Sequence, residues 1–252
     1  MRYAIALLAV ALIVLAAACG DGGDDTPGPK ATAAIEATPT RAASAENTPS
    51  TVIIGAVGPE NIWGYPEPIE TQLFECQGDM ECVTGIMRAN GAPEQAIDFL
   101  TATGWFMTSY DELGTVDLVH VFIPWRANSN FDWALVNGSP AIIYGEDVGG
   151  QLEPDVSDAD YVALLDAYPG LVIWPADERF EAMDTVAGGQ SFVFQYSLND
   201  GCHACGTGYQ WRVALNFAAD GTYETAQLLD ICLTEGGTPA PNTDIGACPD
   251  AS

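Results

Sequence analysis

The globular part of this chain contains no lysine. Residues 52–252 hold 30 aspartates and glutamates against four arginines, which gives a formal net charge near −26. The arginines are Arg88, Arg126, Arg179 and Arg212. A field of this sign repels phosphate backbones and anionic lipid head groups, so we expect no nucleic-acid partner and no docking on the membrane surface. Cationic partners or metal ions are compatible with this charge, although solubility alone also accounts for it.

Histidine is nearly absent, and no serine lies in a G-x-S-x-G sequence. The two histidines are His120 and His203, and a Ser-His-Asp site cannot be assembled around either. His120 falls in an apolar strand pattern, which favours a packed core histidine. We therefore assign no catalytic residue and no metal site, and we expect no cofactor. A hydrolase using two of the 30 carboxylates stays open as an alternative.

Long apolar runs are also lacking, because the longest covers only the 15 residues Ala4–Ala18. A membrane-spanning helix needs roughly 20. The run follows Arg2 and ends in small residues, a pattern typical of a secretory signal peptide. We expect this signal peptide to cover residues 1–18.

The end of the run resembles the lipobox of bacterial lipoproteins. It reads Leu15-Ala16-Ala17-Ala18-Cys19-Gly20, although the family most often has Leu where Ala16 stands. The resemblance implies cleavage before Cys19, acylation of its thiol with a diacylglyceryl group, and a membrane-lipid partner; two acyl chains suffice for stable anchoring. The alternative is an ordinary secretory signal with an incidental cysteine. We expect a location in the cell envelope, lipid-anchored, with the domain on the extracytoplasmic side.

Residues 19–51 are predicted to be the lipid anchor and a disordered tether, because Gly, Asp, Pro, Thr, Ala and Ser dominate them. Residues 52–252 are predicted to form a single domain. Gly149-Gly150 ahead of a polar stretch marks a possible sub-boundary near residue 150.

Six cysteines remain after Cys19, and an even number in an exported chain implies disulfides. Six allow 15 connectivities. Sequence proximity favours the pairs Cys76–Cys82, Cys202–Cys205 and Cys232–Cys248.

The hydrophobic pattern predicts an α+β fold with about eight strands and about three helices. The helices are expected at residues 77–90, 93–103 and 158–168. Most strands come in pairs around turn signals such as Asn137-Gly138 and Asp220-Gly221, so a largely antiparallel sheet of hairpins, stapled by disulfides, is predicted.

The densest group of reactive side chains is Cys202-His203-Ala204-Cys205. These residues are candidates for a redox or metal site, but a redox C-x-x-C needs a helix N-terminus to stabilise its thiolate. Here Gly206-Thr207-Gly208 and a strand pattern follow, and zinc would need a second ligand pair. We favour a structural disulfide, with redox and metal roles as alternatives.

The segment Gly201–Gly206, followed by a hairpin with an Asp-Gly turn, resembles a pattern found in uncharacterised bacterial lipoproteins. The resemblance includes Arg126-Ala127-Asn128 and Val136-Asn137-Gly138. It implies no known activity.

The segment Pro124–Asn128 contains the best candidates for ligand binding. Trp125, Arg126 and Asn128 combine an aromatic ring, a cation and an amide, a set that suits a sugar or a carboxylate. We expect a monomeric, non-catalytic binding or structural domain with an unknown ligand or protein partner. The alternatives are a thiol-disulfide oxidoreductase using Cys202 and Cys205, and the carboxylate hydrolase.

Overall fold

The computed structural model describes residues 55–65, 67–126, 130–176, 178–186 and 188–249. These residues all belong to one compact unit, Thr48–Ser252. The predicted signal peptide, Cys19 and the tether lie outside the described residues, as does Asn128. Within the described ranges, no helix has both the length and the apolarity to cross a membrane.

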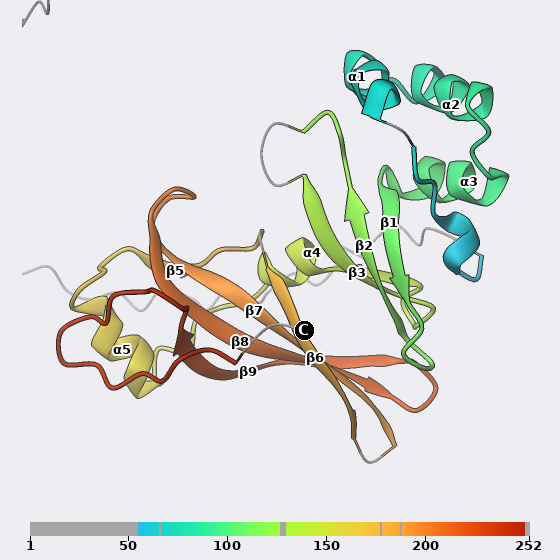
Figure 1. Cartoon of the computed structure of the whole chain (residues 1–252). Coiled ribbons are helices and arrows are strands. Elements are labelled where there is room, and N and C mark those ends of the chain that lie inside the picture. Colours follow the sequence, from blue (N-terminus) through green and yellow to red (C-terminus); the bar gives the residue numbers. More distant parts are fainter. Residues whose placement is uncertain (1–54, 66, 127–129, 177, 187, 250–252) are drawn as a thin grey trace, which may run out of the picture. The chain divides into compact units, whose positions relative to one another are not determined.

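The described residues form five α-helices and one short 3-10 helix, where the sequence predicted about three helices (Figure 1). They are η1 (Pro59–Asn61), α1 (Glu67–Glu75), α2 (Met80–Ala89), α3 (Glu94–Thr103), α4 (Gly145–Gly149) and α5 (Ala159–Leu165). The predicted number was wrong because α1 starts inside a proline-rich stretch that indicates a loop, and α4 is too short for an apolar period.

Nine strands form two sheets in which every strand pair is antiparallel, which confirms the predicted α+β class. The first sheet has the order β1-β2-β3-β4, and the second has the order β5-β7-β8-β9 with β6 also paired to β7. The strands are β1 (Phe106–Asp111), β2 (Asp117–Phe122), β3 (Phe131–Val136), β4 (Ile142–Tyr144), β5 (Leu171–Ile173), β6 (Arg179–Val186), β7 (Gly189–Asp200), β8 (Gly206–Ala218) and β9 (Tyr223–Leu233).

Two sets of hydrogen bonds join the sheets. The side-chain amide of Gln190 in β7 makes two hydrogen bonds to the backbone of Val116, as a neighbouring strand would. It accepts from the Val116 N–H at 2.8 Å and donates to the Val116 carbonyl at 2.9 Å. Ser139, in the turn before β4, accepts from the N–H of Tyr223 at 2.8 Å and donates to the carbonyl of Gly221 at 2.8 Å. These bonds bring β4 and β9, the edge strands of the two sheets, to the same side of the fold.

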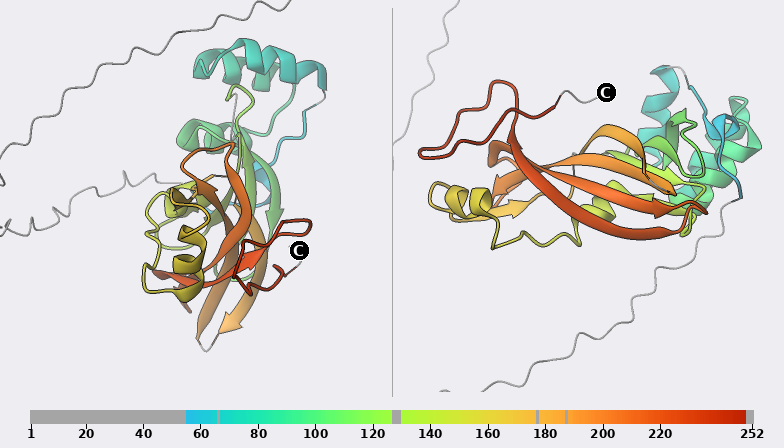
Figure 2. Two further views of the ribbon diagram at one scale, coloured as in Figure 1. Left: turned by 90° about the vertical axis from the view of Figure 1, so that its left-hand side faces the viewer. Right: turned by 90° about the horizontal axis from the view of Figure 1, so that it is seen from below.

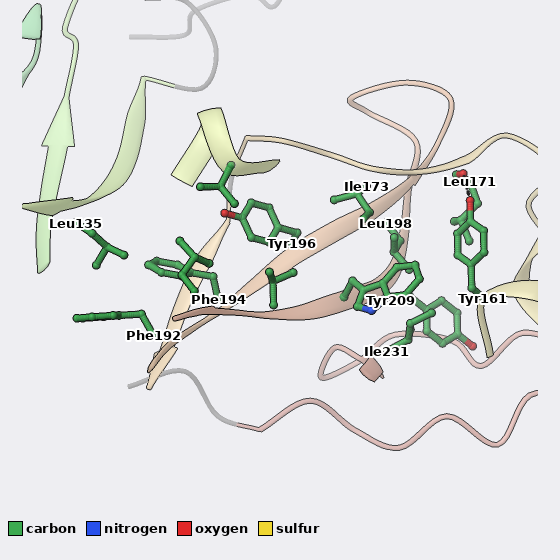
Figure 3. Close-up of a cluster of buried hydrophobic side chains, with 14 of the residues drawn as sticks. Leu135, Tyr161, Leu171, Ile173, Phe192, Phe194, Tyr196, Leu198, Tyr209 and Ile231 are labelled. Atoms are coloured by element: carbon green, nitrogen blue, oxygen red, sulfur yellow. Dashed lines mark hydrogen bonds between the residues drawn. The ribbon is translucent and has the colours of Figure 1, made fainter. Parts of the chain in front are cut away.

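The largest core cluster lies on one face of the second sheet (Figure 3). Alternate residues of β7 and β8 supply its fully buried centre, among them Phe194, Tyr196 and Trp211. Leu118 and Leu135 of the first sheet and Tyr161 of α5 pack against it. The alternation in the middle of β7 and β8 puts polar residues such as Gln195, Gln210 and Arg212 on the opposite face.

The other face of the first sheet packs against the helical layer. Phe99 of α3 belongs to one buried cluster with Val119 and Val121 of β2, and the inner faces of α1, α2 and α3 form another around Leu73 and Leu100. The first sheet is therefore covered on both faces over much of its length.

Three disulfides have the pairing that sequence proximity favoured. Cys76–Cys82 joins the end of α1 to α2, Cys202–Cys205 closes the turn between β7 and β8, and Cys232–Cys248 ties the C-terminal segment to β9. Figure 2 shows this C-terminal segment, coloured red, returning from the end of β9.

Candidate functional site

A groove of about 680 Å³ lies where the edge strands of the two sheets meet. One wall comes from residues 140–144, which include β4, the floor comes from α4 and the segment after it, and the opposite wall comes from β9. The walls are mainly apolar, and they include Ile142, Leu152, Ala226 and Leu228. Grooves of this size and character are the usual sites for small ligands.

The charged groups in the described lining of the groove are both acidic. Asp147 of α4 and Glu153 after it border the groove, with Gln151 between them, and all three are exposed. Partial burial, together with the charge of neighbouring Glu146, raises the pKa of Asp147 above its usual value. The groove therefore offers an apolar surface with a negative edge.

Helix α4 is positioned by a buried pair of carboxyl groups behind the floor. Asp132 of β3 is 3% exposed, and Glu178 next to β6 is 6% exposed. Asp132 accepts from the N–H of Glu146 at 3.3 Å, and Glu178 accepts from the N–H of Trp133 at 3.1 Å. The pair thus links the first sheet, the second sheet and α4.

Glycine at position 145 is what lets the pair approach α4 so closely. A β-carbon there would lie closer than 3.0 Å to the carboxyl oxygen of Glu178. The carbonyl of Gly145 in turn accepts from the Tyr196 hydroxyl at 2.9 Å. A larger residue at 145 would require the Glu178 side chain or α4 to shift.

Burial raises the pKa of Asp132 far above its usual range, and the hydrogen bond and charge of Glu178 add to the effect. Two buried carboxyl groups in contact cannot both ionise at low cost, so the pair holds a proton at neutral pH. The Arg126 guanidinium pairs with Glu146 at 3.1 Å, whereas Asp132 has Glu178 as its partner.

The pair is not arranged as a metal site, since the described part of the chain has no group of three His, Cys, Asp or Glu residues that could hold an ion. Neither Asp132 nor Glu178 lines the groove. Their chemical capacity is to store a proton and to hold α4 in place. Sequence reasoning missed both residues, because they are 46 positions apart and neither lies in a motif.

The predicted binding segment is half-buried where it is described. The Trp125 ring packs edge-on against Phe106 at 6.0 Å, and the Arg126 guanidinium lies 5.5 Å from the centre of the Trp105 ring. Arg126 also makes the ion pair with Glu146. The structure does not bring these two side chains to the groove, and Asn128 lies outside the described residues.

Cys202 and Cys205 form a disulfide in the exposed turn between β7 and β8. The turn is closed by hydrogen bonds from the N–H of Asp200 to the carbonyl of Cys205 and from the Asn199 amide to the carbonyl of His203. The element that follows this turn is β8 and not a helix, so the sulfurs do not precede a helix N-terminus in the chain. The His203 ring stacks on Trp174 at 5.3 Å.

His120 lies on β2 with its ring between two aromatic neighbours. Its ring stacks on Phe131 with 5.3 Å between the ring centres and contacts Trp133 in a tilted arrangement at 4.6 Å, and its Nδ1 is 3.3 Å from the Thr108 hydroxyl. Burial lowers the pKa of His120 below its usual value. These contacts give it a packing role in a half-buried position.

In comparison with known proteins, no family model matches the chain, and no curated protein or solved structure is significantly similar to it. The geometry of the described residues is therefore the basis for a functional proposal.

Proposed function

We propose that this protein is an envelope lipoprotein, anchored through acylated Cys19, whose domain binds a small apolar ligand with a positively charged group. The observation that carries the binding role is the groove between β4, α4 and β9, with its apolar walls and its two carboxylates. An acidic domain attracts cationic ligands over long range and repels anionic ones.

The walls of the groove would supply most of the affinity, because burial of apolar surface contributes about 25 cal/mol per Å². Asp147 and Glu153 would select the charge of the ligand. Both are exposed, so each contributes less than about 1 kcal/mol, which is about fivefold in affinity.

The groove is tested with decyltrimethylammonium and decyl sulfate as probes, which share an alkyl chain and differ in charge. Titration calorimetry of the full chain should detect binding of the ammonium probe and much weaker binding of the sulfate. Ala226→Trp fills the groove and should abolish binding, whereas Asp147→Asn with Glu153→Gln should weaken it by about fivefold.

Leu229→Ala is the matched control, because Leu229 is exposed on β9 next to Leu228 and does not line the groove. Equal binding of the two probes would overturn the charge selectivity. Unchanged binding by Ala226→Trp would overturn the groove as the site.

The anchor is tested separately with Cys19→Ser. This variant should leave the membrane fraction or accumulate as an uncleaved precursor, because the thiol that accepts the lipid is gone. Mass spectrometry of a variant that is still processed and still carries lipid would contradict the anchor.

A further inference from the structure

The outer edge of β9 is paired at both of its ends and open between them. Near its start, the N–H of Tyr223 donates to the carbonyl of Ser139 at 2.8 Å, as part of a parallel bridge between Ser139 and Thr222. Near its end, Leu233 makes a second parallel bridge, to Ala247 of the C-terminal segment. Both ends of this edge therefore already hold a backbone segment in the parallel direction.

Residues 224–230, between the two bridges, form the open stretch of this edge. Among the described residues they have no strand partner on the outer side, since β9 pairs with β8 alone. Each of the seven is exposed or half-buried, and seven residues of a strand span about 23 Å. Alternate N–H and C=O groups of an edge strand point away from the sheet, so this stretch offers hydrogen bonds to a further strand.

The open stretch lacks the usual protection of an exposed edge. Natural edge strands are often blocked by lysine, by proline or by a bulge. Residues 224–230 contain no lysine, arginine or proline. The register of β9 on β8 shifts near both ends of the stretch, but the residues from Thr225 to Leu228 pair with β8 one to one. A regular strand edge therefore lies in the middle of the stretch.

This open edge borders the groove. Ala226 and Leu228 of β9 line one wall, and Ile142 and Tyr144 of β4 line the opposite wall. Because β4 follows the Ser139 bridge along the chain, β4 and β9 start together at a closed end and leave the groove between them. A strand added beside β9 would point every second side chain into this space.

The carboxylates around the open stretch determine which charge a partner must carry. Asp147 and Glu153 border the groove, and Glu224 and Asp230 stand at the two ends of the stretch. Of these four, only Asp230 pairs with an arginine among the described residues. A segment with lysine or arginine is therefore attracted, whereas a second copy of this domain, with a net charge near −26, is repelled.

We propose that the groove and the open edge of β9 together bind an extended cationic peptide segment, which adds to the second sheet beside residues 224–230. Its alternate apolar side chains enter the groove, and its lysine or arginine side chains lie beside Asp147 and Glu153. In strand addition of this kind, main-chain hydrogen bonds supply affinity and the pockets for alternate side chains supply specificity. This inference rests on the proposed function, because it assigns a ligand class to the same groove.

The test uses the acetylated and amidated heptapeptide KTITITK, whose lysines and isoleucines share one face of an extended chain. Titration calorimetry with the full chain should give a dissociation constant of about 1 mM or tighter. The peptide ETITITE should bind at least about tenfold more weakly, because its charge is reversed. Equal binding of the two peptides would overturn the cationic character of the partner.

Two N-methylated forms of KTITITK separate strand addition from simple filling of the groove. One carries its methyl groups on both isoleucines and the other on two threonines, so the side chains and the charge stay the same. Alternate N–H groups point to opposite edges of a strand. The form methylated on the edge toward β9 should therefore lose about tenfold or more in affinity. Parent affinity in both forms would overturn strand addition.

Hydrogen exchange locates the bound peptide. KTITITK should slow the exchange of backbone amides in residues 224–230, whereas decyltrimethylammonium, which has no peptide backbone, should not. Unchanged exchange in these residues with the peptide bound would overturn the proposal.

Ala226→Trp should abolish binding of the peptide, because the new ring fills the groove. Val172→Trp is the matched control, since Val172 is exposed on β5, another edge strand of the same sheet. Unfolding curves show whether each variant is folded. Equal loss of binding in the two variants would overturn the assignment of the peptide to β9.

The two kinds of probe also separate this inference from the proposed function. Binding of decyltrimethylammonium without binding of KTITITK would overturn the peptide ligand and leave the groove as a site. Absence of binding by both would overturn the groove itself. Sedimentation of the free protein as a dimer that KTITITK dissociates would assign the edge to a second copy and would also overturn the proposal.

Discussion

Asp132 and Glu178 show how a single residue can gain a role that its sequence neighbours do not reveal. Asp132 lies in a strand between Phe131 and Trp133, where a polar residue normally faces solvent, yet it is buried. Its burial depends on Glu178, which comes from the second sheet. The hydrophobic pattern of a single strand cannot indicate a contact between two sheets. Sequence reasoning could therefore state only that a carboxylate pair was possible.

Because of this pair, we expect the free energy of unfolding to depend on pH, and we expect Asp132→Asn to remove that dependence. Asp132 has a raised pKa in the folded state, so the folded protein binds more protons than the unfolded chain above about pH 4, and stability falls as the pH rises. The slope is at most about 1.4 kcal/mol per pH unit. Asp132→Asn should therefore gain stability relative to the parent between about pH 5 and pH 8.

Urea unfolding of the full chain at several pH values measures this difference. Asp98→Asn is the control, because Asp98 is exposed on α3 and its loss changes the net charge by the same amount. A parallel pH profile for Asp132→Asn and Asp98→Asn would show that the pair stores no proton.

At the scale of elements, hairpins were easier to predict than helices. Asn137-Gly138 and Asp220-Gly221 stand between strands as expected, because those dipeptides accept the backbone of a tight turn. By contrast, β6 and α4 were missed. β6 has an irregular burial pattern with a bulge, and α4 is one turn whose conformation depends on tertiary contacts.

Alanine substitutions at two adjacent glycines, Gly149 at the end of α4 and Gly150 after it, test how tightly α4 packs against its neighbours. A β-carbon at Gly149 would lie 2.7 Å from both the Pro175 α-carbon and the Tyr196 ring, whereas at Gly150 the nearest atom is a carbonyl oxygen at 3.4 Å. Gly149→Ala should thus cost about 1–3 kcal/mol of unfolding free energy.

Gly150→Ala provides the comparison, since alanine is favoured over glycine in helical backbone by up to about 1 kcal/mol. Gly150 has helical dihedral angles, so this variant should be neutral or stabilised. Urea denaturation gives both values. Equal effects of the two substitutions would mean that α4 moves freely away from Pro175.

For the whole molecule, the α+β class and the antiparallel pairing followed from the sequence, because strand alternation and turn chemistry are local. The groove could not be predicted in this way. It exists because Ser139 and Thr222, far apart in sequence, bring two edge strands together. The course of the C-terminal segment could not be predicted either, although its disulfide to β9 was expected.

The charge of the whole domain leads to a prediction about salt. Residues 52–252 contain 30 carboxylates and only four arginines. Three of those arginines form ion pairs among the described residues. Most of the negative charge is therefore unpaired and repels itself in the compact state. The Debye length falls from about 30 Å at 0.01 M salt to about 10 Å at 0.1 M, so added NaCl should raise the unfolding temperature at neutral pH.

Thermal unfolding of the full chain from 0.01 to 0.15 M NaCl measures the effect, and the same series near pH 4 is the internal control. About half of the exposed carboxyl groups are protonated at this pH, so the repulsion and its screening should both shrink. A rise of equal size at both pH values would indicate a general salt effect on hydrophobic burial. A flat or falling dependence at neutral pH would mean that bound cations already neutralise the carboxylates.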